Sequence, residues 1–276
     1  MATATMSIEA FARYAYPPNE LGYCGPPDAQ ALLRAHPDAV GHAEAFTGAW
    51  PYLELIAAAA GLPPLHPEVS RTYWVGGPLL GAVDGAVLLG HLRTAMAGQP
   101  TGLLDALDDE VDLLAHHSFH VMVVYPWIRL LRSGPATPLG ILQACRIRWG
   151  TVDEVDGDTV VIDSAPLEFD GERLLLGAVR PETVRWRRGQ TSLTPQPRRG
   201  QVVSAHWNWI CDTLDQPQHD ELATATKTTL GLVNRLLASG AAGPRERRLS
   251  EQLQDAAPAA TPTTRGAKPV VVPPRR

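Results

Sequence analysis

Thiol and imidazole side chains are the groups in this sequence that could carry chemistry. The 276-residue chain contains three cysteines, Cys24, Cys145 and Cys211, and nine histidines. Thiolate sulfur and imidazole nitrogen are the donors with which proteins bind zinc, copper and iron. Three widely spaced cysteines do not make a disulfide framework. We therefore expect each cysteine to be either a buried, small apolar side chain or a working thiol.

The densest group of potential ligands is the run His116-His117-Ser118-Phe119-His120. On a helix, His116 and His120 would share one face at a spacing of four residues, which can bind a metal ion. The glutamate of a zinc protease helix is absent, and no third ligand is evident. We therefore favour an interior or partner-facing polar patch here.

Cys24 lies between two glycines, in Gly22-Tyr23-Cys24-Gly25-Pro26, where the backbone can approach other groups closely. It could be a second thiol ligand or part of a docking loop. The interpretation we favour is a buried cysteine that holds the loop against the helices, because free cysteine is among the most buried residue types. A third possibility is a nucleophile, which predicts a lowered thiol pKa beside a pocket.

Cys145 is followed closely by Arg146 and Arg148. Guanidinium groups near a thiol lower its pKa and can hold an anionic complex. We therefore expect a reactive thiol at Cys145.

The first half of the chain has apolar residues at helical spacing, punctuated by proline and glycine. A turn is expected at residues 17–20, and Asp28 and Gly61 have the types of helix caps. The expected helices span residues 29–36, 52–60, 67–75, 84–97 and 105–131, the last kinked or split at Pro126.

From Pro138 onwards, short β-branched runs alternate with turns. The dipeptides Asp156-Gly157 and Asp170-Gly171 each indicate a β-hairpin. Further strands are expected at residues 183–186 and 202–207, which together suggest a small closed barrel. Trp207 and Trp209 would lie on one side of the last strand. A helix should follow Pro217 to about Leu237, and residues 239–276 have the composition of a disordered tail.

Composition and motifs exclude several functions. The net charge is −5, and the folded body is more acidic still because the tail is basic, which argues against nucleic acid as a partner. Asp84 interrupts the most apolar stretch, so no membrane span is expected, and the N-terminus lacks a signal peptide pattern. We expect a cytoplasmic protein. Nucleotide-binding loops, hydrolase elbows and dithiol motifs are all absent, so we do not expect an enzyme.

The second half of the chain resembles the HypC/HupF family of [NiFe]-hydrogenase maturation chaperones. The stretch from Cys145 to Val152 matches the family motif C-x-x-[IV]-P-G-x-V at its cysteine, glycine and valine. Residues 154–163 match the family's hairpin, and residues 200–210 match its later strand, including His206. The chain departs from the family in two ways: Trp149 replaces the motif proline, and Cys145 is not an N-terminal residue.

The resemblance implies that Cys145 and His206 are candidate iron ligands, with a transient Fe(CN)2CO unit as cargo. It also implies two partners, a HypD-like scaffold protein and the hydrogenase large subunit or its precursor. The alternative is a docking or structural subunit of the hydrogenase complex whose barrel has lost iron binding, with Trp149 filling the site. Residues expected beside the site or at a partner surface are Arg146, Arg148, Trp149, Trp207, Trp209, Cys24 and Tyr23.

The whole chain also resembles an actinobacterial family associated with hydrogenase gene clusters, on the strength of residues 11–26 and 48–54. The predicted fold class is α+β. A helical N-terminal domain (1–137) precedes a small antiparallel, OB-like and HypC-like β-barrel with a C-terminal helix (138–238) and a tail (239–276). The expected function is that of an accessory protein in hydrogenase assembly.

Overall fold

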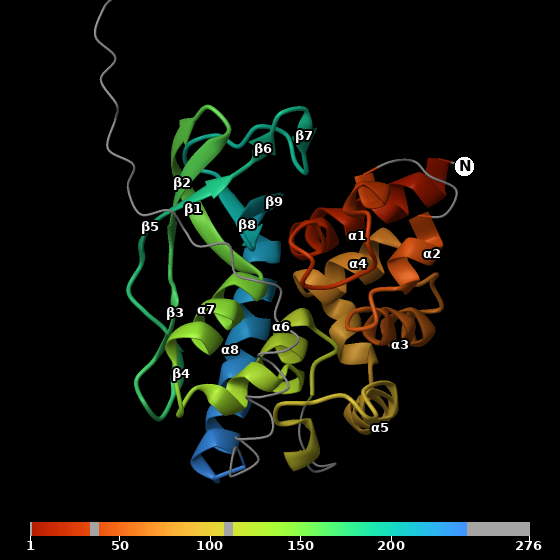
Figure 1. Ribbon diagram of the computed structural model, residues 1–276. Coiled ribbons are helices and arrows are strands. Elements are labelled where there is room, and N and C mark those ends of the chain that lie inside the picture. The colour runs from red at the N-terminus through yellow and green to blue at the C-terminus, as the bar shows by residue number, and fades with distance from the viewer. Residues whose placement is uncertain (1, 34–38, 108–112, 242–276) are drawn as a thin grey trace, which may run out of the picture.

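The structure is a computed structural model that describes residues 2–33, 39–107 and 113–241 (Figure 1). The predicted disordered tail lies outside the described residues from position 242 onwards.

Helices and helical turns make up all the regular structure described before residue 146. They are α1 (Ala2–Glu20), η1 (Ala29–Leu33), α2 (Ala39–Glu44), α3 (Trp50–Ala60), α4 (Pro67–Trp74), η2 (Pro78–Ala82), α5 (Gly85–Ala95), η3 (Leu104–Ala106), α6 (His117–Phe119), η4 (His120–Val124), η5 (Pro126–Leu130) and α7 (Ala136–Cys145).

Capping residues define the ends of the helices that were predicted well. Gly61 adopts a left-handed conformation (φ 66°) after α3, and its N–H bonds to carbonyls of the last turn. The Asp84 side chain accepts the Val87 N–H at the start of α5. The helices predicted over 52–60, 67–75 and 84–97 are therefore confirmed to within a few residues.

Two predictions near the N-terminus are wrong. Helix α1 continues through Pro17 and Pro18 to Glu20, so no turn begins there. The Pro18 carbonyl accepts the Tyr23 N–H at 2.9 Å, because a proline near a helix end still supplies an acceptor. Asp28 has a left-handed backbone (φ 72°) and is not the expected helix cap; the 3₁₀ helix η1 follows it, and residues 34–36 of the predicted helix lie outside the described residues.

The predicted long helix over 105–131 is wrong as one helix, although the split expected at Pro126 is confirmed, and residues 108–112 lie outside the described residues. Its described residues form η3, α6, the π-helical turn η4 and the 3₁₀ turn η5. Pro126 holds Tyr125 in an extended conformation (ψ 137°), which ends η4. Every residue of η4 is buried, so helical periodicity in this run does not mark one exposed face.

The main sheet contains five strands in the order β1-β2-β5-β9-β8, and β8 also pairs with β1. These strands are β1 (Arg148–Asp156), β2 (Thr159–Ser164), β5 (Arg180–Arg185), β8 (Val202–His206) and β9 (Trp209–Leu214). The other pairings are antiparallel, but β5 and β9 meet in one parallel pair, Arg185 with Trp209. The sheet is therefore mixed, and the prediction of an antiparallel barrel is wrong at this junction.

Both predicted Asp-Gly hairpins are present, in different sheets. The first joins β1 to β2, where Gly157 has a left-handed backbone (φ 56°). The second joins β3 (Leu167–Phe169) to β4 (Leu174–Leu176) as a separate two-stranded sheet. Strands β6 (Arg187–Arg188) and β7 (Thr191–Ser192) form another.

A tight turn replaces the end of the predicted strand 202–207. Trp207, with φ 52°, and Asn208 connect β8 to β9, and His206 pairs with Trp209. The prediction that Trp207 and Trp209 share one face of a strand is wrong, because the chain reverses between them.

The C-terminal helix α8 (Gln216–Ala238) confirms the predicted helix and begins with a capping box between Asp215 and Gln218. Figure 1 shows α8 running beside α6 and α7, below the main sheet. One hydrophobic core joins the helical half to α8, from Phe11 to Val233, and a smaller one fills the sheet around Ile162. No helix in the described ranges has the length and apolarity needed to cross a bilayer.

Candidate metal centre

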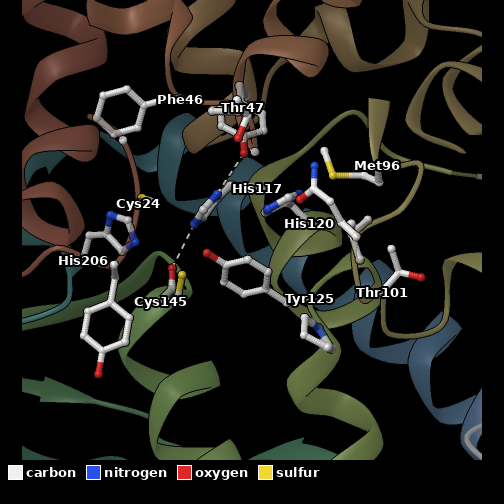
Figure 2. Close-up of a pocket in the computed structure, with 18 of the residues that line it drawn as sticks. Cys24, Phe46, Thr47, Met96, Thr101, His117, His120, Tyr125, Cys145 and His206 are labelled. Atoms are coloured by element: carbon white, nitrogen blue, oxygen red, sulfur yellow. Dashed lines mark hydrogen bonds between the residues drawn. The ribbon is translucent and has the colours of Figure 1, made fainter. Parts of the chain in front are cut away.

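A cavity of about 260 Å³ lies where the helices meet one end of the main sheet (Figure 2). Three of the histidines and cysteines that line it lie close together, each from a different element: His117 from α6, Cys145 from the end of α7 and His206 from the end of β8. One ligand atom from each residue lies within 4.8 Å of the others, and all three residues are buried.

Cys145 occupies the junction between a helix and a strand. Helix α7 ends at Cys145, and β1 begins three residues later. A helix C-terminus leaves carbonyl groups without intrahelical partners. The Cys145 carbonyl accepts a hydrogen bond from His117 Nε2 at 2.9 Å, which ties α6 to the end of α7.

His206 presents a bare nitrogen. Its Nδ1 lies 2.7 Å from the Tyr14 carbonyl oxygen, and since a carbonyl only accepts, Nδ1 carries the proton. Its Nε2 is therefore an acceptor, and it is buried with no hydrogen-bond partner in the described part of the chain. A backbone carbonyl on one imidazole nitrogen and a free lone pair on the other is the usual arrangement of a metal-binding histidine.

His117 has partners at both ring nitrogens. Nε2 donates to the Cys145 carbonyl, so Nδ1 accepts the hydroxyl proton of Tyr73 at 3.1 Å. Binding a metal through Nε2 would move the ring proton to Nδ1. Nδ1 would then donate a hydrogen bond to the Tyr73 hydroxyl oxygen, because a phenol oxygen both donates and accepts hydrogen bonds.

Burial keeps all three groups uncharged before a metal binds. It lowers the pKa of His206 to about 3 and that of His117 well below its usual value, where His206 and His120 add to the effect. Burial, and then the nearby Cys24, raise the pKa of Cys145. The prediction that Arg146 and Arg148 lower this thiol pKa is wrong.

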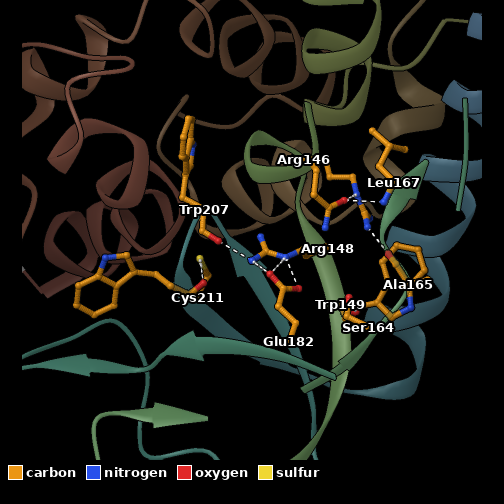
Figure 3. Close-up of polar contacts among 11 residues, drawn as sticks. Arg146, Arg148, Trp149, Ser164, Ala165, Leu167, Glu182, Trp207 and Cys211 are labelled. Carbon is orange, nitrogen blue, oxygen red and sulfur yellow. Dashed lines mark hydrogen bonds and ion pairs between the residues drawn. The ribbon is translucent and has the colours of Figure 1, made fainter. Parts of the chain in front are cut away.

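The two arginines face the sheet and not the cavity (Figure 3). Arg148 holds Glu182 with two nitrogens, Nη2–Oε1 at 2.6 Å and Nε–Oε2 at 2.9 Å, and also donates to the Trp207 carbonyl. Arg146 donates to Gln143 Oε1 at 3.0 Å and to the Ala165 carbonyl. These contacts join the end of α7 to the sheet, so the role in holding an anionic cargo is not supported.

Tyr23 and Cys24 line the cavity, as expected for residues beside the site. The Tyr23 ring packs on the Trp207 indole with centroids 4.1 Å apart, which docks the loop after α1 onto the β8–β9 turn. None of the three tryptophans expected beside the site, Trp149, Trp207 and Trp209, lines the cavity. Trp149 packs edge-on against His219 and does not fill the site, and the buried Trp209 donates to Glu20 Oε2.

The remaining cysteines are both protonated thiols at neutral pH. Burial raises the pKa of Cys24 to about 12, so the predicted nucleophile with a lowered pKa is wrong. Asn19 Nδ2 bonds to the Cys24 and Pro26 carbonyls and fixes the loop. Cys211 is buried, away from the cavity lining, and its thiol lies 3.7 Å from the Trp209 carbonyl, which fits the first of the two roles expected for the cysteines, a buried, small apolar side chain.

His116 and His120 do not share a helical face, because α6 begins only after His116, whose backbone is extended. His116 caps α6 by accepting the Ser118 N–H, while His120 lines the cavity with Nδ1 3.3 Å from the Tyr52 hydroxyl. The sequence missed His117 as a ligand. Its only indication was membership of the histidine run.

Two imidazoles and one thiol converging from three elements suit a transition metal, and they leave further coordination positions free. The fold and the cavity thus define an α+β protein with a buried His–Cys–His site. The chain belongs to the family of unknown function DUF6390, whose profile matches residues 3–240. No curated protein and no solved structure matches it significantly.

Proposed function

We propose that this protein binds a transition metal at His117, Cys145 and His206 and acts as an accessory protein in [NiFe]-hydrogenase assembly. It would carry the Fe(CN)2CO unit or hold it for the large-subunit precursor. The observation that carries the proposal is the convergence of His117, Cys145 and His206, each with a ligand atom within 4.8 Å of the others. His206 Nε2 is in addition buried without a hydrogen-bond partner among the described residues.

The number and type of donors suit this cargo. Low-spin iron prefers six ligands and is bound well by thiolate and imidazole. An iron with three exogenous diatomic ligands therefore has room for three protein donors, and His117, Cys145 and His206 provide three. The alternative in which Trp149 fills the site loses its basis, since Trp149 packs against His219.

The strand order supports the resemblance to HypC-like chaperones. A five-stranded sheet in the order β1-β2-β5-β9-β8 that returns to β1 is similar to an OB-like barrel. Cys145 lies just before β1, and His206 is the last residue of β8, so the two residues keep the order along the chain that the resemblance implies. The partners would be a HypD-like scaffold protein and the large subunit or its precursor, bound in the cytoplasm without catalysis by this chain.

Iron analysis of the full chain, coexpressed with a hydrogenase gene cluster, tests the proposal. We expect roughly one iron per chain, with infrared bands of bound CO and cyanide. Cys145→Ala and His206→Ala should lose both, while Cys211→Ser, which changes a buried thiol outside the cavity, should keep them.

An iron-free wild-type protein, or Cys145→Ala with full iron and intact hydrogenase maturation, would overturn it. Stoichiometric copurification of iron-free protein with mature hydrogenase would instead support the docking subunit.

A further inference from the structure

A second thiol faces the same cavity from the opposite half of the fold. Cys24 belongs to the loop between α1 and η1, and it lines the cavity together with Cys145 (Figure 2). Two of the three cysteines of the chain therefore line one cavity, Cys145 buried and Cys24 half-buried.

The charge balance of the cavity favours two thiolates. Its lining includes no aspartate, glutamate, lysine or arginine among the described residues, and imidazole binds a metal as a neutral ligand. A divalent ion bound by one thiolate and two imidazoles would leave a net charge of +1 in this uncharged space. An unpaired buried charge is strongly unfavourable, and a second thiolate would cancel it.

We propose that Cys24 is a fourth protein ligand, so that a bare divalent ion is held by Cys24, His117, Cys145 and His206. The proposal rests on the metal-binding function above and extends it. Two sulfur and two nitrogen donors form a set that binds zinc and related divalent ions tetrahedrally. His206 Nε2, buried without a partner, is the independent sign that this space receives a ligand.

The loop that carries Cys24 is anchored on both sides. Tyr23 packs on Trp207, and Asn19 bonds to the Cys24 and Pro26 carbonyls. Gly25 is closely packed, since a Cβ there would lie 2.4 Å from the Phe46 ring. Cys24 Sγ is not one of the atoms grouped within 4.8 Å. To bind the metal, the Cys24 sulfur would therefore have to move towards the other three ligands, while the residues on either side of Cys24 stay in place.

The binding reaction is balanced by protons. Cysteine binds a metal as the thiolate, so each thiol gives one proton to the buffer as its sulfur binds the ion. Histidine binds as the neutral imidazole and releases none. Two protons per ion are expected for four ligands, and one proton if Cys24 stays unbound.

Titration of metal-free, full-length protein with Co²⁺ tests the proposal, because near-ultraviolet sulfur-to-cobalt absorption counts bound thiolates. The wild type should release two protons per cobalt. Cys24→Ser should lose about half of the absorption, release one proton and bind at least ten-fold more weakly. Cys211→Ser is the matched control and should behave like the wild type.

Alkylation of the wild-type protein provides a second measurement that needs no variant to fold. Bound Co²⁺ should protect both Cys24 and Cys145 from iodoacetamide, as mass spectrometry would show. Cobalt bound with one proton released and Cys24 unprotected would overturn the fourth ligand and leave the proposed function standing. If the wild type binds neither cobalt nor iron, both proposals fail.

Discussion

Two buried polar regions meet at the segment 145–148, and they treat charge in opposite ways. Cys145 faces the cavity, where burial raises its pKa and lowers the pKa values of His117, His120 and His206, so these groups are kept neutral. Arg146 and Arg148 face the sheet, where carboxylate and carbonyl oxygens receive their charged N–H groups. We call these the neutral cavity and the arginine cluster.

The difference shows why nearness in sequence misled the interpretation of the thiol. Arg146 follows Cys145 directly, yet its guanidinium points to the Ala165 carbonyl on the other side of the chain. In the arginine cluster, the charged side chains form hydrogen bonds and an ion pair that hold α7 to the sheet. The neutral cavity keeps lone pairs unoccupied, so a metal ion would bring the only charge. The two regions should therefore differ in their response to pH and to the loss of a charged partner.

Acid should produce the largest effect, through the histidines of the neutral cavity and through the buried His116, which caps α6. Burial lowers the pKa values of His116 and His120 to about 4 and that of His206 to about 3. Their pKa values in the unfolded chain are near 6.5, so the unfolded state binds more protons between those limits and stability falls as the pH falls. Each histidine should remove roughly 3 kcal/mol between pH 6.5 and 4.

Together these losses approach a typical total stability, so metal-free protein should unfold above pH 4. Urea unfolding at pH 7, 6 and 5 would measure the slope. His120→Gln should reduce the pH dependence of the unfolding free energy by the equivalent of up to one proton taken up on unfolding. His219→Gln, near the surface, should not reduce it. Equal stability at pH 7 and pH 5 would show that the imidazoles are not buried as neutral groups.

The arginine cluster should give the next largest effect, on stability alone. The Arg148 side chain is only 3% exposed, whereas that of Glu182 is 31% exposed. Glu182→Ala should cost about 3 kcal/mol, because it strands a buried charge. Arg148→Met should cost less, since the remaining carboxylate can reach water. Chemical denaturation of both variants measures the order.

A surface pair provides the control for this order. Arg199 and Asp153 are paired at 2.9 Å but well exposed, so Arg199→Ala should cost less than about 0.5 kcal/mol. If Arg148→Met proves the more damaging of the two cluster variants, the cluster does not depend on pairing a buried charge.

Local chemistry made part of this architecture predictable. The Asp156-Gly157 hairpin, the Gly61 cap and the helix after Pro217 depend on residues next to one another in the chain. Strand β9 was missed because its turn uses Trp207 at φ 52°, a conformation that sequence patterns assign to glycine or asparagine.

The candidate site was only half predictable for a related reason. Cys145 and His206 came from motif positions, and the structure brings them together. His117 joins them only because α6 packs against the end of α7, a contact between residues 28 positions apart. No periodicity in the histidine run could show this, since His116 is extended and the helix begins after it.

The smallest expected effect separates binding from packing within the neutral cavity itself. Tyr73 and Tyr52 are both buried, and each places its hydroxyl beside a histidine Nδ1, at His117 and His120 respectively. Tyr73→Phe should weaken Co²⁺ binding roughly ten-fold, because the hydroxyl that orients a ligand is lost. Tyr52→Phe should leave the affinity unchanged, since its histidine is not a proposed ligand. Both should cost about 1 kcal/mol of stability, so unfolding alone cannot tell them apart. Equal affinities for the two variants would remove His117 from the ligand set.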